Sequence, residues 1–140
     1  MKRVGLIVQE ETIKYSQIKT SKEVYDMVEH LYDKLPYEKV IIIYLNNANI
    51  PLYIEDPHTI GSDTGSIIDI KRVVKTALDT YCKNIIMVHN HPSGNLKPSQ
   101  ADLSVSNKLS KALELLDMKL LDSIIIGHKD YYSLQDNGDL

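Results

Sequence analysis

The stretch from Val88 to Asp102, V-H-N-H-P-S-G-N-L-K-P-S-Q-A-D, most constrains how this chain can fold. Its histidines, His89 and His91, follow the apolar run 85–88, which predicts a buried strand. Side chains two residues apart on a strand point to the same face, whereas on a helix they would diverge by roughly 200°. Both imidazoles can therefore converge on one point at the end of a strand.

A turn and a helix start follow that strand. Pro92 and Gly94 end the strand and favour a turn. After Pro98, Ser99 is a good helix N-cap, and Asp102 lies on the same side of the first helical turn. Two strand-end histidines that face a helix-start carboxylate can form a three-ligand zinc site with an open fourth position. Because Ser99-x-x-Asp102 is also an ordinary capping motif, spacing alone leaves both the metal site and a purely structural cap open.

The whole string H-N-H-P-S-G-x-x-x-P-S-x-x-D, residues 89–102, resembles the JAMM (MPN+, JAB1) metalloprotease signature. It is most similar to the bacterial RadC-like branch of that superfamily. The similarity runs from about Ser21 to the C-terminus and includes L-L-D-S-I-I-I-G and Y-Y-S-L near the end. The resemblance implies a zinc-dependent hydrolase of peptide or isopeptide bonds, in which His89, His91 and Asp102 hold Zn²⁺.

The resemblance also implies catalytic roles for two further residues. The family's general base is a glutamate near the start of the strand after the first helix, and that position falls on Glu38. Spacing alone does not select Glu38, and Glu55 is its nearest competitor. Ser99 would donate its hydroxyl to the oxyanion of the tetrahedral intermediate, and one such donor contributes about 3–4 kcal/mol. Asn90, between the histidines, is expected to point to the opposite face in a structural role.

Two departures from many RadC-like chains bear on function. The sequence begins almost directly with the metal-binding domain, so we expect a stand-alone domain without a helix-hairpin-helix region. Residues 67–72 stand where relatives often have a His-Pro-Arg-Glu stretch. Two rival functions stay open: a DNA-repair-associated protein that binds nucleic acid, and a non-catalytic MPN-like scaffold. A basic patch from Lys71, Arg72 and Lys75 would favour the first.

Composition and charge restrict the expected partners. A net charge of −3 and a pI near 5.9 give no global basic field, so nucleic-acid binding is expected to be weak. The single Cys82 excludes an internal disulfide, no run of about 18 apolar residues occurs, and residues 4–8 are too short for a signal peptide. We expect a cytoplasmic protein without a membrane partner. Its expected substrate is a peptide or an isopeptide-linked protein, and a homodimer stays open.

The order of elements predicts one α/β domain over residues 1–140, with a strand or arm in 1–19 and the catalytic core in 20–140. Helices are expected at 20–34, 67–81 and 99–116, the last with Leu116 facing inward. Strands are expected at 3–9, 38–46, 50–60, 85–88, 120–126 and 131–134, with a polar loop at 61–65. The resemblance implies that these elements form a mixed β-sheet flanked by helices, of JAB/MPN (cytidine-deaminase-like) architecture. Three other histidines, His30, His58 and His128, lack a partner at ligand spacing, although His58 follows a strand that could run near the site.

Overall fold

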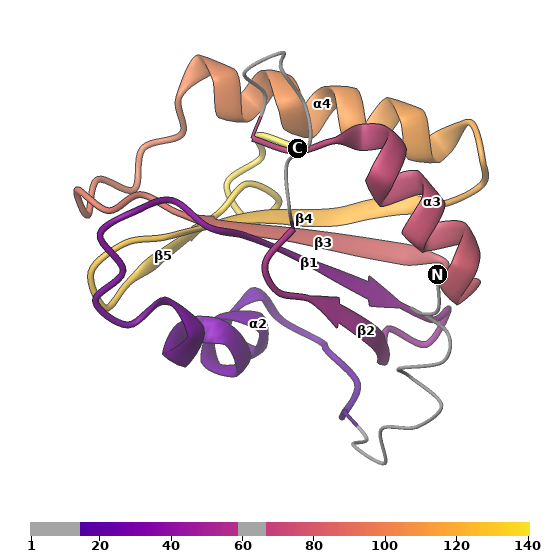
Figure 1. Ribbon diagram of the computed structural model, residues 1–140, viewed down its shortest axis with the longest axis horizontal. Helices are drawn as coiled ribbons and strands as arrows, with labels where there is room; N and C mark the ends of the chain where they lie inside the picture. Colours follow the sequence, from indigo (N-terminus) through magenta and orange to yellow (C-terminus); the bar gives the residue numbers. More distant parts are fainter. Residues whose placement is uncertain (1–14, 59–66) are drawn as a thin grey trace.

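The computed structural model describes residues 15–58 and 67–140, so the strand expected at 3–9 and the loop expected at 61–65 lie outside the described residues. The described chain contains short helices and one sheet (Figure 1). In chain order the elements are α2 (Ser21–Val28), the 3-10 helix η1 (Glu29–Tyr32), β1 (Val40–Leu45), β2 (Pro51–Glu55), α3 (Ile70–Thr80), β3 (Asn84–Asn90), α4 (Gln100–Glu114), β4 (Lys119–Ile126) and β5 (Tyr131–Ser133).

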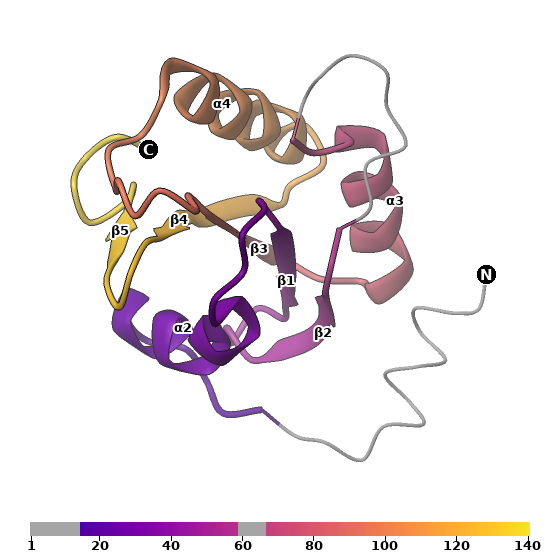
Figure 2. The same cartoon turned by 60° about the vertical axis from the view of Figure 1, so that its left-hand side comes forward.

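The five strands form one mixed sheet in the order β2-β1-β3-β4-β5. The pairs β1–β2, β1–β3 and β4–β5 are antiparallel, and β3–β4 is parallel. Helices α3 and α4 cover one face of the sheet and α2 covers the other, as Figures 1 and 2 show. The predicted α/β class with a helix-flanked mixed sheet is confirmed.

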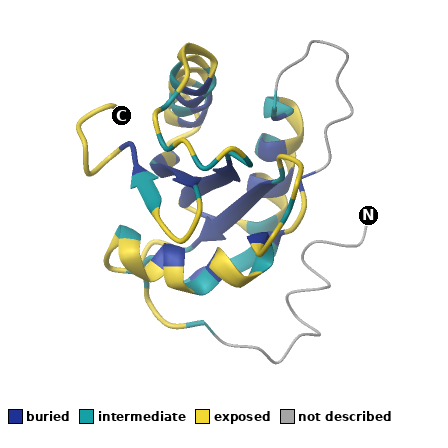
Figure 3. Cartoon of the chain, turned by 90° about the vertical axis from the view of Figure 1, so that its left-hand side faces the viewer, coloured by how far each residue is buried: buried dark blue, intermediate teal, exposed yellow. Residues whose placement is uncertain are grey.

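The central strands β1 and β3 are buried along their whole length, because both faces of the sheet are covered (Figure 3). Alternate residues supply two cores: Ile42 and Met87 belong to the cluster shared with α3 and α4, whereas Ile41 and Val88 belong to the cluster shared with α2. A fully buried aliphatic side chain stabilises a fold by about 1.5–3 kcal/mol, so these strands are a rigid platform for residues at their ends.

The register of β1 on β3 places the segment before β1 beside the histidines. The last printed pair of this antiparallel ladder is Val40 with His89. Because the strands run in opposite directions, the next positions place Lys39 opposite Asn90 and Glu38 opposite His91. Residues opposite one another in an antiparallel pair point to the same face, so Glu38 emerges on the side of the two imidazoles.

Several element ends differ from those predicted. The first helix is α-helical only to Val28 and tightens into η1, and Lys34 then has a left-handed φ of 56° before Pro36. Strand β2 ends at Glu55, because Pro57 has no N–H for the ladder. The inward position expected for Leu116 is wrong: it lies beyond the end of α4 and is 46% exposed.

Within residues 15–58 and 67–140, no helix has the length and apolar character needed to cross a membrane.

Candidate metal centre

The two histidines lie at the carboxyl end of β3 with their ring centroids 5.2 Å apart. His89 is 1% exposed, and neither of its ring nitrogens has a hydrogen-bond partner among the described residues. Its Nε2 nevertheless lies 3.1 Å from Oδ1 of Asp102, and Nε2 of His91 lies 3.0 Å from Oδ2 of the same carboxylate. The strand end and the helix start therefore meet as the sequence predicted.

Ser99 and Asp102 form a reciprocal capping box at the start of α4. The Asp102 N–H donates to the Ser99 hydroxyl over 3.0 Å, and the Ser99 N–H donates to Oδ2 of Asp102 over 2.8 Å. Burial alone would raise the pKa of the Asp102 carboxyl, but the nearby His89 and the Ser99 backbone outweigh burial and hold that pKa well below its usual range. The cap therefore orients an ionised carboxylate toward the imidazoles, so capping and metal binding do not compete.

A backbone carbonyl in the turn after β3 sets the orientation of His91. Nδ1 of His91 lies 2.6 Å from the carbonyl oxygen of Asn95. Because a carbonyl only accepts, Nδ1 must carry a proton, which leaves Nε2, 3.0 Å from Oδ2 of Asp102, as the nitrogen that a metal ion could use. This contact is the outer-shell bond that fixes the tautomer of metal-binding histidines in other proteins.

The same turn requires a glycine at position 94. Gly94 has φ 86°, and a Cβ built on it would lie 2.6 Å from Nδ1 of His128. His128 in turn lies with Nε2 3.0 Å from the Pro92 carbonyl oxygen. His128 is therefore a support of the turn that carries His91, a role that sequence spacing did not reveal. His30 is exposed on η1.

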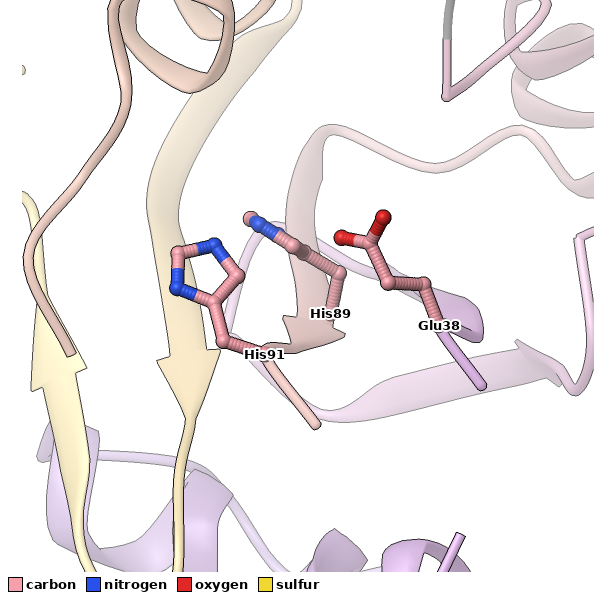
Figure 4. A group of neighbouring side chains, drawn as sticks. All are labelled: Glu38, His89 and His91. Carbon is pink, nitrogen blue, oxygen red and sulfur yellow. The ribbon is translucent and has the colours of Figure 1, made fainter. Parts of the chain in front are cut away.

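Glu38 reaches the histidines from the segment that precedes β1. One carboxylate oxygen of Glu38 and one ring nitrogen each of His89 and His91 lie within 4.8 Å of one another. Figure 4 shows the three side chains projecting to the same side from neighbouring strand ends. Glu38 is exposed, and no hydrogen bond or ion pair holds its carboxylate within the part of the chain that the structure describes. Among the described residues, its capacity to accept a proton is therefore not used by the fold.

Glu55, the competing carboxylate, is occupied by structural contacts. Its Oε1 accepts from the Tyr44 hydroxyl over 2.9 Å and lies 3.0 Å from Nδ1 of His58, while Arg72 Nε lies 3.5 Å from its Oε2. His58 is likewise satisfied, because its Nε2 accepts from the Asp69 N–H over 3.0 Å. His58 does line a cavity with Glu38 and His89, as its chain position suggested, but both of its ring nitrogens hold the strand end against α3.

The residues present fit a zinc ion. Ligand atoms on a tetrahedral zinc lie about 3.3 Å apart, as bond lengths of about 2.0–2.1 Å require. The 3.1 and 3.0 Å separations between the imidazole nitrogens and the Asp102 oxygens are close to that value. His89 is buried, and neither of its ring nitrogens has a hydrogen-bond partner among the described residues, so a cation at Nε2, beside Asp102, would use a lone pair that the fold otherwise buries. Two nitrogens and one carboxylate are a known catalytic zinc set.

Together the mixed sheet, the His-x-His strand end and the Ser-x-x-Asp helix start define a JAB-type α/β domain. Residues 18–139 match the family described as RadC-like JAB domain, so the chain belongs to that family. A UPF0758 protein of Flavobacterium johnsoniae is 36% identical over 129 residues, which cover 92% of this chain and 56% of the relative. A UPF0758 protein of Methanosarcina mazei is 40% identical over 122 residues, which cover 87% of this chain and 53% of the relative.

The chain therefore spans about half the length of the curated relatives it matches. The RadC-like family predicted from the motif is confirmed. The structure adds a Glu-His-His group placed for metal binding, whereas the identity of the metal and the bond that is cleaved belong to the proposal below.

Proposed function

We propose that this chain is a zinc-dependent hydrolase of peptide or isopeptide bonds, with His89, His91 and Asp102 as the metal ligands. The observation that carries the proposal is the meeting of two imidazole nitrogens with one ionised carboxylate, beside the Glu38 carboxylate, which has no hydrogen bond or ion pair among the described residues. Membership of the RadC-like JAB domain family supports the same reading.

Zn²⁺ bound at these residues would lower the pKa of a coordinated water to about 7. Glu38 would accept a proton from water and pass it to the leaving amine, because its exposed carboxylate is within reach of the site. The Ser99 hydroxyl accepts from the Asp102 N–H with a lone pair, so its own proton can be donated to the oxyanion. The cap of α4 would thereby serve both the fold and the reaction.

Cavities on both sides of the histidines support an extended substrate. One, of about 560 Å³, is lined by Glu38, His89, Tyr37 and Pro57. The other, of about 610 Å³, is lined by His91 and Pro92 together with residues of η1 and the β4–β5 turn. A polypeptide that crosses the site would contact both cavities, whereas a small amide would use only one. We therefore propose a polypeptide substrate.

The test is a cleavage assay on zinc-loaded protein with a library of peptides and lysine-linked isopeptides. Products detected by mass spectrometry should appear with wild type and should be reduced by about 10²–10⁴-fold with Glu38→Gln. Chelation by a metal-binding competitor should abolish them, and zinc should restore them. If cleavage were equal in wild type and Glu38→Gln, the products would come from another protease or another base.

Nucleic-acid binding is less well supported as a function. In the candidate basic patch, Lys75 lies 3.0 Å from Asp79 and Arg72 lies 3.5 Å from Glu55, so neighbouring carboxylates offset part of its charge. The scaffold alternative gives no role to the buried His89, whose Nε2 lies beside Asp102 and whose ring nitrogens have no hydrogen-bond partner among the described residues. A cytoplasmic location and a homodimer stay predictions.

A further inference from the structure

Asn90 makes two hydrogen bonds that bracket the proposed base. It is the last residue of β3 and is 4% exposed. Its Oδ1 accepts from the Lys39 N–H over 2.7 Å, and its Nδ2 donates to the Tyr37 carbonyl over 3.0 Å. Tyr37 and Lys39 are the two neighbours of Glu38 in the chain. One side chain therefore holds the backbone on both sides of Glu38.

These bonds stand where the ladder between β1 and β3 stops. The last backbone-paired residues are Val40 and His89, and the next pair would be Lys39 and Asn90. At this position the side-chain carboxamide of Asn90, rather than its backbone, forms the hydrogen bonds to the backbone of the segment before β1. The segment that carries Glu38 is thus fastened to the histidine strand by a side chain.

Among the described residues, the other polar contacts of this segment are made by Lys39. Lys39 anchors its far side, because its ammonium donates to the Leu31 carbonyl over 2.7 Å and lies 3.0 Å from Asp56. Tyr37 is 59% exposed, and Glu38 is exposed. An exposed segment opens locally more easily than a buried one, and a small displacement of a catalytic group costs much of its rate.

We propose that Asn90 is a positioning residue, which fixes Glu38 relative to the imidazoles of His89 and His91 through the backbone of residues 37 and 39. The inference rests on the proposed role of Glu38 as the base. The strand would then supply metal ligands from one face and the clamp for the base from the residue between them. This replaces the unspecified structural role predicted for Asn90 from the sequence.

Asparagine suits this task because its planar amide carries a donor and an acceptor side by side. The Lys39 N–H can only donate and the Tyr37 carbonyl can only accept, so both partners agree on the orientation of the amide. Aspartate would keep the acceptor and lose the donor, and alanine would lose both.

The test is amide hydrogen exchange of the zinc-loaded chain by NMR, in wild type, Asn90→Ala and Asn84→Ala. Asn84 is the matched control: it is the first residue of β3, is 8% exposed, and donates to the Asn49 side chain over 2.7 Å at the opposite end of the strand. Exchange of the Lys39 amide should accelerate about tenfold or more in Asn90→Ala and stay unchanged in Asn84→Ala. Zinc content should equal that of wild type in all three proteins.

On a substrate found by the library assay, Asn90→Ala should lower kcat by roughly 10–100-fold with little change in KM, and Asn84→Ala should not. If Asn90→Ala fails to fold, the test uses Asn90→Asp instead. In that variant the Lys39 amide should stay protected from exchange, and kcat should be reduced. Unchanged Lys39 exchange in Asn90→Ala, or unchanged kcat in a variant that has lost the clamp, would overturn the inference. A wild type that cleaves nothing would contradict the proposed function alone, because exchange would still decide whether the clamp exists.

Discussion

The substitutions Glu38→Gln and Glu55→Gln should have opposite effects on stability and on catalysis. Glu38 is exposed, and the structure shows no bond to its carboxylate within residues 15–58 and 67–140. Glutamine there keeps the volume and loses only the proton acceptor. The free energy of unfolding should therefore change by less than about 0.5 kcal/mol, as is usual for surface substitutions.

Glu55 is expected to behave differently because its side chain is only 9% exposed and it accepts from two buried donors, the Tyr44 hydroxyl and Nδ1 of His58. Hydrogen bonds to a charged group contribute about 1.5–3 kcal/mol each, and a neutral acceptor keeps about half of that. The partly exposed Arg72 at 3.5 Å adds little. Glu55→Gln should therefore destabilise the fold by about 1.5–3 kcal/mol.

Urea unfolding measures the first effect and amide hydrolysis the second. Glu38→Gln should unfold like wild type and lose about 10²–10⁴-fold in rate, whereas Glu55→Gln should unfold at lower urea and keep most of its activity at low temperature. If Glu38→Gln were as destabilised as Glu55→Gln, Glu38 would be structural. If Glu55→Gln alone were inactive while folded, the base would be misassigned.

Three further predictions concern other parts of the chain. With a net charge of −3, binding to any DNA structure at physiological salt should be weak by fluorescence anisotropy, and nanomolar affinity would restore the repair-protein hypothesis. In urea unfolding, Gly94→Ala should lower the free energy of unfolding by about 1 kcal/mol more than Gly138→Ala. Both glycines have positive φ, but only a Cβ at position 94 would clash with His128. Equal losses of stability would show that His128 does not support the turn. Burial raises the pKa of the Asp122 carboxyl, so protonated Asp122 adds to the stability of the fold below its unfolded pKa of about 3.9, and this added stability is lost as pH rises through the folded pKa. Wild type should therefore lose stability relative to Asp122→Asn as pH rises from about 4. A stability difference that does not depend on pH would contradict this prediction.

The parts of the site that could be predicted from the sequence are those fixed by local geometry. Side chains alternate between the two faces of a strand, so His89 and His91 lie on one face. The first turn of a helix places Asp102 beside the N-cap residue Ser99. Both follow from residues close together in the chain, and the structure confirms that they meet. The helices and strands likewise follow from hydrophobic periodicity, whereas their arrangement as a mixed sheet was implied by the family resemblance.

Glu38 and Asn90 show what local patterns do not contain. Glu38 reaches the histidines through the register of β1 on β3, and Asn90 bonds residues 51 and 53 positions away. Contacts between residues far apart in the chain produce no recognisable spacing in the sequence. The family resemblance alone therefore pointed to Glu38, and the hydrogen bonds of Asn90 to residues 37 and 39 were not predicted. The prediction for Leu116 was wrong for a different reason, because it extended the helical period past Glu114, where α4 ends.

Elemental analysis of zinc in purified protein tests the central claim most directly. Wild type, reconstituted and freed of loosely bound metal, should carry about one zinc per chain, because the three proposed ligands meet at the end of β3. The double variant His89→Ala/His91→Ala should carry none while Glu38→Gln keeps its zinc. Equal zinc in wild type and the double variant would contradict the site.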